Sequence, residues 1–334
     1  MLKVLYVNAL TSAQADNIPA ETMGALCFAQ IAEKIDTKGN STFAHVAMPC
    51  LGGENVLYEF LQTIGPIQSG QNGDVRFKCN DKVLFGVITL DESKFSDEAN
   101  TPPLQLASKA AYEQIFATLE SQDFPYVLRF WNYMADINRT THELERYRQF
   151  NLGRQQAFSA KGQEVSGNVP AACALGTMDG PLTIAFLAGR TASLPIENPR
   201  QVSAYDYPAQ YGPRSPLFSR ASLASVNATN ILFLSGTASI VGHQTLHAGD
   251  VIAQTEESIA NIAAVLDVAN QKASKKFKIT DLDYIVYIRN PEHFLSVSSV
   301  LKARIGPNVK ATYVQADICR FDLLVEIEGS VEQQ

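Results

Sequence analysis

Apolar positions in the last third of the chain change from the spacing of a strand to the spacing of a helix and back. Residues 231–242 begin as a β-rich apolar run and pass into a Gly/Ser/Thr segment. Apolar residues then recur every three to four positions over 250–271, and Asp250 can cap this segment, which predicts an amphipathic helix. The pattern after it predicts a strand, a proline-initiated helix and two strands, at 281–290, 290–306, 309–318 and 323–329.

The same order recurs upstream, although few residues are identical. The pattern predicts a helix, a strand, a second helix and a pair of strands, at 109–121, 124–138, 142–158 and 170–189. Such recurrence indicates a tandem structural duplication. We therefore expect an α/β (α+β) protein of two domains, 1–195 and 196–334, each a mixed β-sheet packed by helices. The first 100 residues carry no motif of use.

The duplication allows the two copies to be compared. Both strand pairs end in glycine, and aligning Gly189 with Gly329 sets TIAFLAG against LVEIEG. The second copy then carries Glu326 and Glu328 where the first has apolar residues. An acid present in one copy alone predicts one active site. Taken by itself, Glu326 is typical of a solvated strand residue.

Between the two copies lies a long irregular segment, residues 191–221, rich in Pro, Tyr and Arg. Segments of this length within a compact protein are usually functional or disordered. Guanidinium groups bind carboxylates in a bidentate manner and tyrosine hydroxyls add donors. The segment is therefore predicted to bind a ligand through residues among Arg200, Tyr205, Tyr207, Tyr211, Arg214 and Arg220.

Composition narrows the class of partner. The chain has 46% hydrophobic and 18% charged residues and a formal net charge of −7. No Lys/Arg-rich run occurs, so neither nucleic acid nor membrane is expected as a partner, while an anionic small molecule is compatible with local arginines. Five scattered cysteines without a CxxC pair favour a reduced, cytoplasmic protein. His243 and His247 lack a third ligand nearby, so no metal site is predicted.

Several stretches resemble known families. "GDVIAQTEESIANIAAVL", "DYIVYIRNPEHF" and "LLVEIE" are similar to the Rid/YjgF pattern, a small α/β (chorismate-mutase-like) fold whose sites lie between subunits of a trimer. "NPRQVSAYDYPAQYGPRSPLFSRA", "LSGTASIVGHQTLHAGD" and "RFWNYMADIN…ERYRQFNLGR" resemble the chorismatase family. The resemblance covers roughly residues 125–329 and implies two Rid/YjgF-like domains.

The chorismatase resemblance implies a cofactor-independent enzyme that cleaves chorismate and releases pyruvate. Its 3-hydroxybenzoate-forming type, the 3-hydroxybenzoate synthases, is marked by a glycine in the S-G-T-A-S segment and a cysteine seven residues before a catalytic glutamate. Gly236, Cys319 and Glu326 match these marks. The resemblance therefore implies that Glu326 is the general acid and that Cys319 takes part in catalysis. Without it, Cys319 is a small buried hydrophobe and Gly236 a β-bulge.

For substrate binding we select Arg154, Tyr207, Tyr211, Arg214 and Gly236. Arg154 could equally belong to a surface ion pair, and Arg289 is equally compatible with a structural role. Three alternatives stay open: a hydrolytic chorismatase that gives the 3,4-dihydroxycyclohexa-1,5-diene carboxylate, a Rid-like metabolite-binding protein, and a Rid-type imine deaminase. Two fused copies can form a cleft within one chain, so a monomer is expected, with a trimer as the alternative.

Overall fold

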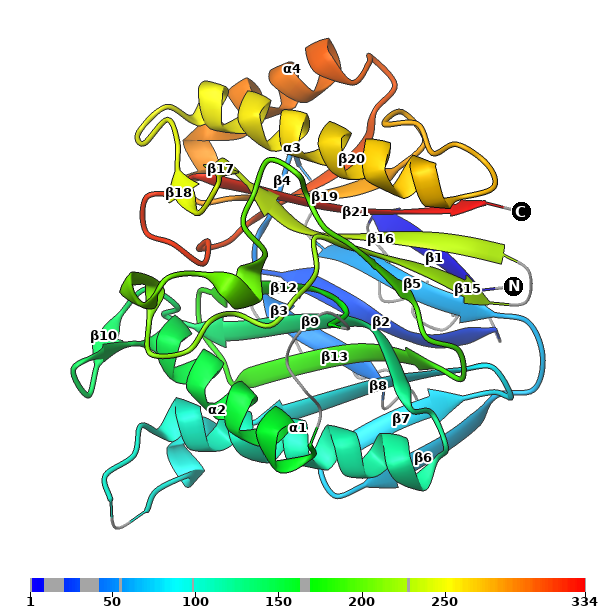
Figure 1. Ribbon diagram of the computed structural model, residues 1–334, viewed down its shortest axis with the longest axis vertical. Coiled ribbons are helices and arrows are strands. Elements are labelled where there is room, and N and C mark those ends of the chain that lie inside the picture. The colour runs from blue at the N-terminus through cyan, green and yellow to red at the C-terminus, as the bar shows by residue number, and fades with distance from the viewer. Residues whose placement is uncertain are drawn as a thin grey trace.

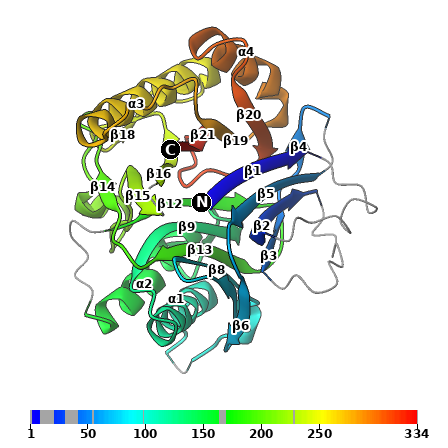
Figure 2. The same ribbon diagram turned by 90° about the vertical axis from the view of Figure 1, so that its right-hand side faces the viewer.

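The computed structural model describes residues 2–8, 21–30, 42–53, 56–97, 99–162, 169–226 and 229–333. Three β-sheets pack against one another in the middle of the molecule (Figures 1 and 2). One pair of helices covers the sheets at the top of Figure 1 and another pair covers them at the bottom. The expected α/β class is confirmed.

The C-terminal sheet has the strand order β14-β15-β16-β21-β19-β20-β4. Its strands are β14 Leu194–Ile196, β15 Ala221–Val226, β16 Thr229–Ala238, β21 Val325–Gln333, β19 Asp283–Ile288, β20 Lys310–Gln315 and β4 Cys50–Leu51. The helices α3 (Val251–Lys272) and α4 (Phe294–Arg304), the latter preceded by the short η5 (Pro291–His293), cover one face. The Asp250 side chain accepts a hydrogen bond from the backbone amide of Ala253, which confirms the predicted N-cap.

The central sheet has the order β12-β9-β13-β8-β7-β6. Its strands are β12 Ala171–Thr177, β9 Tyr126–Ala135, β13 Leu182–Gly189, β8 Val83–Leu90, β7 Val75–Cys79 and β6 Gln68–Asn72. It is covered by α1 (Pro103–Ser121) and α2 (Arg146–Ala160). Helix α1 begins at Pro103, before the predicted 109, and Pro102 is its N-cap residue. Proline suits this position because the backbone N–H that it lacks would have no partner in the first turn of a helix.

These two sheets repeat one plan. Read along the chain, β7-β8-α1-β9-α2-β12-β13 corresponds to β15-β16-α3-β19-α4-β20-β21, and the strands occupy the same places in both sheet orders. In the two sheets the corresponding pairs β12–β9 and β20–β19 are parallel, and the next pairs, β9–β13 and β19–β21, are antiparallel. The tandem duplication inferred from the sequence is therefore present in the topology.

The N-terminal residues add a third sheet that the sequence did not predict. Its order is β3-β2-β5-β1, with β3 Phe43–Ala47, β2 Thr22–Ala29, β5 Val56–Thr63 and β1 Leu2–Asn8. The β3–β2 pair is parallel, while β2–β5 and β5–β1 are antiparallel, as for β20–β19, β19–β21 and β21–β16. The same four-strand order thus occurs three times in one chain, although residues 9–20 and 31–41 lie outside the described part.

The inner faces of the three sheets form one apolar core, and the two helix layers form separate ones. In β21, Val325 and Ile327 face α3 and α4, whereas Glu326 and Glu328 lie on the opposite face. The predicted alternation is correct, but its polar face points into the protein. Both glutamates are buried.

A β-bulge changes the predicted alignment of the two copies. The pairing of β13 with β9 shifts between Leu187 and Ala188. When the final glycines are aligned, the counterpart of Glu326 is Phe186. Because of the shift, Phe186 packs in the core on the helix side, and its neighbour Ala185 lies on the inner face where Glu326 lies in the other copy. The counterpart of Glu326 is apolar in either alignment.

The link between the copies is mostly irregular, as predicted. Besides β14 it contains only two short 3-10 turns, η3 (Ala204–Asp206) and η4 (Ala209–Tyr211). The predicted domain boundary at 195/196 falls within β14, and β4, from the N-terminal part of the chain, joins the C-terminal sheet. The division into domains 1–195 and 196–334 therefore stays a prediction. Short ribbons β10–β11 (Thr140–Thr141, Leu144–Glu145) and β17–β18 (Ile240–Val241, Gln244–Thr245), with η2 (Glu92–Lys94), complete the described elements.

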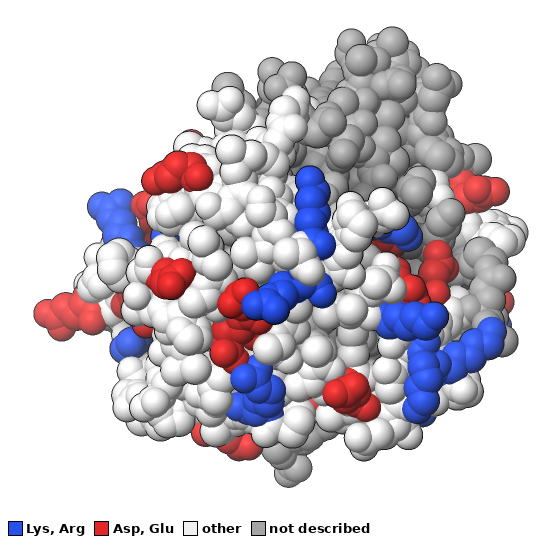
Figure 3. Space-filling view, turned by 90° about the horizontal axis from the view of Figure 1, so that it is seen from above, with Lys and Arg blue, Asp and Glu red and all other residues white. Residues whose placement is uncertain are grey.

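Within the described residues, no helix has the length and apolar character needed to cross a bilayer. Figure 3 views the molecule from above Figure 1, and acidic and basic side chains are interspersed on that face. It therefore presents both signs of charge rather than one extended basic surface.

Candidate active site

A cavity of about 540 Å³ lies between the two helix-bearing repeats. The start of α2, from the central repeat, supplies Tyr147 and Arg148 to its wall. The C-terminal repeat supplies Gly236 from β16 and Glu326 from β21, and the irregular link supplies further side chains. The cavity is thus built from parts of the chain that are distant in sequence.

Glu326 lies at this cavity with only 4% of its surface exposed. Burial and the neighbouring Glu328 carboxylate raise its pKa to about 8, although Arg129 and Arg220 oppose the shift. The carboxyl group is therefore mostly protonated at neutral pH. A protonated carboxylic acid at a cavity is suited to act as a general acid.

Gly236 lies beside this acid. The pairing of β16 with β21 shifts between Leu234 and Thr237, so Gly236 lies in a β-bulge. A Cβ atom at this position would approach the Glu326 carboxyl far more closely than atoms can. The bulge and the absence of a side chain together leave room for the acid.

Cys319 lies in the turn between β20 and β21. Its sulfur is 4.0 Å from Oε2 of Glu326. Burial and Glu326 raise the pKa of Cys319 to about 12, so the group is a neutral thiol rather than a thiolate. The turn is held by Arg289, which donates hydrogen bonds to the carbonyl oxygens of Leu323 and Arg320 at 2.8 and 3.0 Å. Arg289 therefore has a structural role, one of the two roles that the sequence left open for it.

Arg320, from the same turn, also lines the cavity. Its guanidinium lies 4.1 Å from the ring centroid of Tyr211 and 5.3 Å from that of Tyr207. It donates to the carbonyl oxygen of His243 at 2.9 Å. Its Nη2 atom is buried and has no hydrogen-bond partner among the described residues. This nitrogen is available to an anionic ligand.

Arg220 completes the aromatic wall. It donates a 2.8 Å hydrogen bond to the hydroxyl of Tyr207 and stacks near Phe218, with 5.1 Å from its guanidinium to the ring centroid. Tyr211 lies 5.5 Å from Tyr207, centroid to centroid. The tyrosines selected from the sequence, Tyr207 and Tyr211, therefore line the same cavity as Glu326 and Cys319.

Two selected arginines do not line this cavity. Arg214 is exposed, and Arg154 is buried behind the wall, where it donates to Asn151 at 2.8 Å and lies over the Phe150 ring. Arg154 is therefore not a surface ion-pair partner. Sequence reasoning did not select Tyr147, Arg148 or Arg320, whose positions depend on how α2 meets the β20–β21 turn.

The histidines make contacts other than metal ligation. His243 Nδ1 lies 3.1 Å from the Tyr211 hydroxyl, and His247 lies beside Glu257. Among the described residues, no group of three or more His, Cys, Asp or Glu side chains could hold a metal ion.

Comparison with known proteins places this geometry in a family. Residues 59–188 match the family described as "Chorismatase FkbO/Hyg5-like, N-terminal", and residues 218–333 match "Endoribonuclease L-PSP". A chorismatase from Streptomyces hygroscopicus is 37% identical over 80% of this chain and 76% of its own length. The chain belongs to the chorismatase family.

Two further relatives agree with this assignment. A 3-hydroxybenzoate synthase from Streptomyces hygroscopicus is 40% identical over 67% of this chain and 69% of its own length. A chorismatase crystal structure at 1.08 Å resolution is 30% identical and superposes with a TM-score of 0.86, covering 99% of this chain and 98% of that one. The resemblance noted in the sequence is confirmed, and the architecture of this chorismatase-family chain is shared over nearly its whole length.

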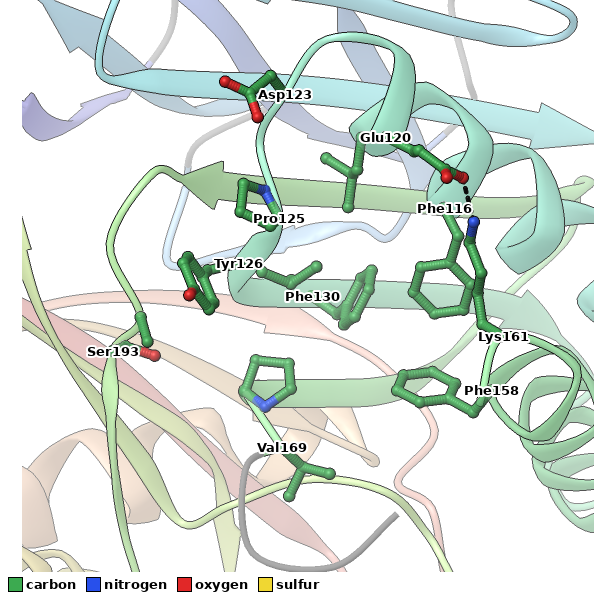
Figure 4. Close-up of a pocket in the computed structure, with 14 residues that line it drawn as sticks. Phe116, Glu120, Asp123, Pro125, Tyr126, Phe130, Phe158, Lys161, Val169 and Ser193 are labelled. Atoms are coloured by element: carbon green, nitrogen blue, oxygen red, sulfur yellow. Dashed lines mark hydrogen bonds and ion pairs between the residues drawn. The ribbon is translucent and has the colours of Figure 1, made fainter. Parts of the chain in front are cut away.

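A second cavity lies elsewhere in this chorismatase-family fold. It has a volume of about 580 Å³ and lies between the ends of α1 and α2 and the start of β9. Phe116, Phe130 and Phe158 form an apolar floor, and Lys161 pairs with Glu120 at its edge (Figure 4). None of the selected site residues lines it. The cavity at Glu326 is therefore the candidate active site.

Proposed function

We propose that this protein cleaves the enolpyruvyl ether of chorismate and yields pyruvate and 3-hydroxybenzoate. The proposal rests chiefly on one observation: Glu326 is a buried carboxyl group with a pKa raised to about 8, placed at a cavity lined by arginine and tyrosine. Family membership supports the same substrate class, since the relatives are described as chorismatase and 3-hydroxybenzoate synthase.

Glu326 is proposed as the general acid. An enol ether is cleaved after a proton is added to its methylene carbon, which forms a C–H bond and leaves an oxocarbenium ion. Protonated Glu326 supplies this proton and becomes a carboxylate. The resulting carboxylate stabilises the adjacent cation, because opposite charges attract strongly in a site of low polarity.

The product depends on whether water enters the reaction. Chorismate has the composition of pyruvate plus 3-hydroxybenzoate, so this route consumes no water, oxidant or reductant. The hydrolytic route adds one water molecule and yields the diene. The family resemblance assigns the ring's own hydroxyl as the nucleophile of the first route. Cys319 and Gly236, both beside Glu326, are proposed to favour that route by controlling the space around the acid.

The two carboxylates of chorismate need fixed cationic partners. Arg320 is proposed to bind one of them through Nη2, while Arg220 and the hydroxyls of Tyr207 and Tyr211 supply further donors. Arg148, which also lines the cavity, is a candidate for the second carboxylate. The side chains at this site thus match an anionic substrate, as the sequence predicted.

The active unit is proposed to be a monomer in the cytoplasm. Tyr147 from the central repeat and Glu326 from the C-terminal repeat line one cavity, so a single chain supplies both walls. The five cysteines are all free thiols, which suits a reducing compartment.

The experiment that tests the proposed function is incubation of the purified protein with chorismate, followed by chromatographic identification of products. We expect 3-hydroxybenzoate and pyruvate in equal amounts. Glu326→Gln should lower pyruvate release by roughly two to four orders of magnitude, the usual contribution of a general acid, with an unchanged circular dichroism spectrum. Glu256→Gln, a half-buried α3 residue that pairs with Arg304 outside the cavity, is the control. Full pyruvate release by Glu326→Gln would exclude this acid.

A further inference from the structure

Arg129 and Glu328 form an ion pair inside the core shared by the three sheets. Arg129 lies on β9 of the central repeat and Glu328 on β21 of the C-terminal repeat, and each is 2% exposed. Nη2 of Arg129 lies 2.5 Å from Oε2 of Glu328. The other carboxylate oxygen, Oε1, accepts a 2.7 Å hydrogen bond from the hydroxyl of Tyr287. Both oxygens of Glu328 therefore have partners.

The same arginine also contacts the strand that makes room for the acid. Nη1 of Arg129 donates a 2.5 Å hydrogen bond to the carbonyl oxygen of Leu234, the last paired residue before the bulge that contains Gly236. The other bulge residue, Ser235, accepts a 2.9 Å hydrogen bond from the backbone amide of Ala172 on β12. Two strands of the central repeat thus hold this bulge from across the repeat interface.

A purely structural role explains this arrangement poorly. The pair packs against the apolar core of the three sheets, with the buried Glu59 of β5 as a further charge near Arg129. Buried ion pairs can often be replaced by apolar residues with little loss of stability or even a gain. Here the pair also has a specific place. Glu328 lies two positions after Glu326 on the same face of β21, and Tyr287 is paired with Glu326 in the strand register.

We infer that Arg129 and Glu328 are positioning residues for the acid of the proposed reaction, Arg129 by fixing the Gly236 bulge and Glu328 by placing a balanced negative charge beside Glu326. This inference rests on the proposed function of Glu326. Other ionisable groups also face the acid from several elements: Arg220, Cys319, Tyr147 on α2 and Cys173 on β12. The pair differs from these in that its side chains join β9 of the central repeat both to the strand that carries the bulge and to β21.

The first test removes the charge and keeps the shape. Glu328→Gln removes the negative neighbour of Glu326 and also the carboxylate that Arg129 contacts, so less of the positive charge of Arg129 is neutralised. Both changes favour the ionised form of Glu326, so the acid should lose its proton at lower pH. The midpoint at which kcat for chorismate falls should move down by about one pH unit or more. A midpoint that stays within about 0.3 units of the wild-type value would overturn the role of Glu328.

The second test removes both charges. Arg129→Met combined with Glu328→Leu removes both charges of the pair together, which buried pairs often tolerate. Glu59 then lacks the nearby charge of Arg129, so circular dichroism checks the fold. With the bulge no longer fixed, kcat should fall roughly tenfold or more and the diene fraction should rise, while KM changes little. Wild-type kcat and product ratio in a folded double variant would exclude a positioning role for Arg129. If the double variant does not fold, Arg129→Lys is used for this readout, since it keeps the charge but loses the two-pronged contact.

The control lies on the same strand. Phe130→Leu changes the neighbour of Arg129 that faces α1 and α2, so it lowers stability without touching the cavity at Glu326. Its kcat, pH midpoint and product ratio should remain those of the wild type. A shift as large as that of Glu328→Gln would show that loss of stability alone moves the profile, and would overturn the inference.

A readout without turnover separates this inference from the proposed function. The Glu326 carboxyl can be titrated by infrared difference spectroscopy, with Glu326→Gln as the blank. If the wild type does not cleave chorismate, the proposed function fails. The midpoint in Glu328→Gln still decides whether the pair controls Glu326: a lower midpoint supports the inference and an unchanged one contradicts it.

Discussion

Gly236 lies directly against the carboxyl group of Glu326. A Cβ atom built on Gly236 would stand 1.8 Å from Oε1 and 2.7 Å from Cδ of Glu326. Outside Gly236 and its two chain neighbours, the three nearest heavy atoms all belong to Glu326, so the side chain that a substitution would displace is the acid itself. The glycine is therefore required by the position of the acid, whatever else the bulge does for the strand.

Replacement of Gly236 by alanine should change the reaction more than the fold. Because the Glu326 carboxyl must move, we expect pyruvate release to fall roughly tenfold to a hundredfold and the diene to rise relative to 3-hydroxybenzoate. Chromatography of the products from chorismate measures both. Gly189→Ala is the matched control, because Gly189 ends β13 and its added Cβ would only touch Leu128, at 3.2 Å. An unchanged rate and product ratio in Gly236→Ala would contradict the proposed placement.

The pH dependence of kcat/KM should follow the protonated form of Glu326. Since a general acid acts when protonated and the pKa is raised to about 8, the rate should be flat in weakly acidic solution and fall as the pH rises through about 8. A coupled assay of pyruvate across this range provides the measurement. A rate that increases through pH 8 would instead indicate a group that acts when deprotonated.

Ionisation of Glu326 should also lower the stability of the folded protein. The pKa of Glu326 in the folded state, about 8, lies above its ordinary value of 4.5. Its contribution to stability is therefore complete below pH 4.5 and is lost as the pH rises through 8, because ionisation becomes unfavourable inside the fold.

Glu326→Gln removes this ionisation, so its Tm relative to the wild type should rise with pH. We expect a gain of several degrees near pH 9, at about 2–4 °C for each kcal/mol, and little gain near pH 5. Differential scanning calorimetry at the two pH values measures the difference. Gln271→Ala, at an exposed position of α3, changes no titratable group and should give a Tm difference that is independent of pH.

Cys319→Ala should alter the product more than the rate. The thiol is neutral and lies 4.0 Å from the acid, so it fills space and offers a weak donor rather than a nucleophile. Its removal opens room for water, and the diene fraction should rise while pyruvate release stays within about tenfold of the wild type. Cys79→Ala, a buried thiol on β7, is the control. An unchanged product ratio would remove Cys319 from product control.

The repeat plan and the acid could be predicted because both leave a local pattern. Helical spacing, strand alternation and turn residues place α3, β19, α4, β20 and β21 near their observed bounds. The comparison of the two copies pointed to Glu326 and Glu328, which interrupt an apolar pattern that the first copy keeps, and the resemblance to the chorismatase family selected Glu326. The third sheet was not found, since its strands carry no repeated motif to compare.

The cationic wall could not be predicted for a different reason. Arg320 occurs in the short CRFD turn, and nothing local shows that its guanidinium stacks on Tyr207 and Tyr211, which precede it by more than a hundred residues. Arg214 was selected as an arginine of the same Arg- and Tyr-rich segment, but its side chain is exposed. This segment lines the cavity through Tyr207, Tyr211 and Arg220 rather than through Arg214.

The two arginines Arg320 and Arg214 give a prediction that separates the sequence interpretation from the structural one. Arg320→Met keeps much of the stacked length of the side chain and removes the unpaired Nη2 donor. If this donor binds a carboxylate of chorismate, KM should rise roughly tenfold to a hundredfold, the usual loss for a charge-assisted hydrogen bond. Arg214→Met, at an exposed position outside the cavity, should leave KM within about twofold. Steady-state kinetics on both variants, with matching circular dichroism spectra, decides between them. A large rise in KM for Arg214→Met with none for Arg320→Met would show that the link segment closes over the substrate in a different arrangement.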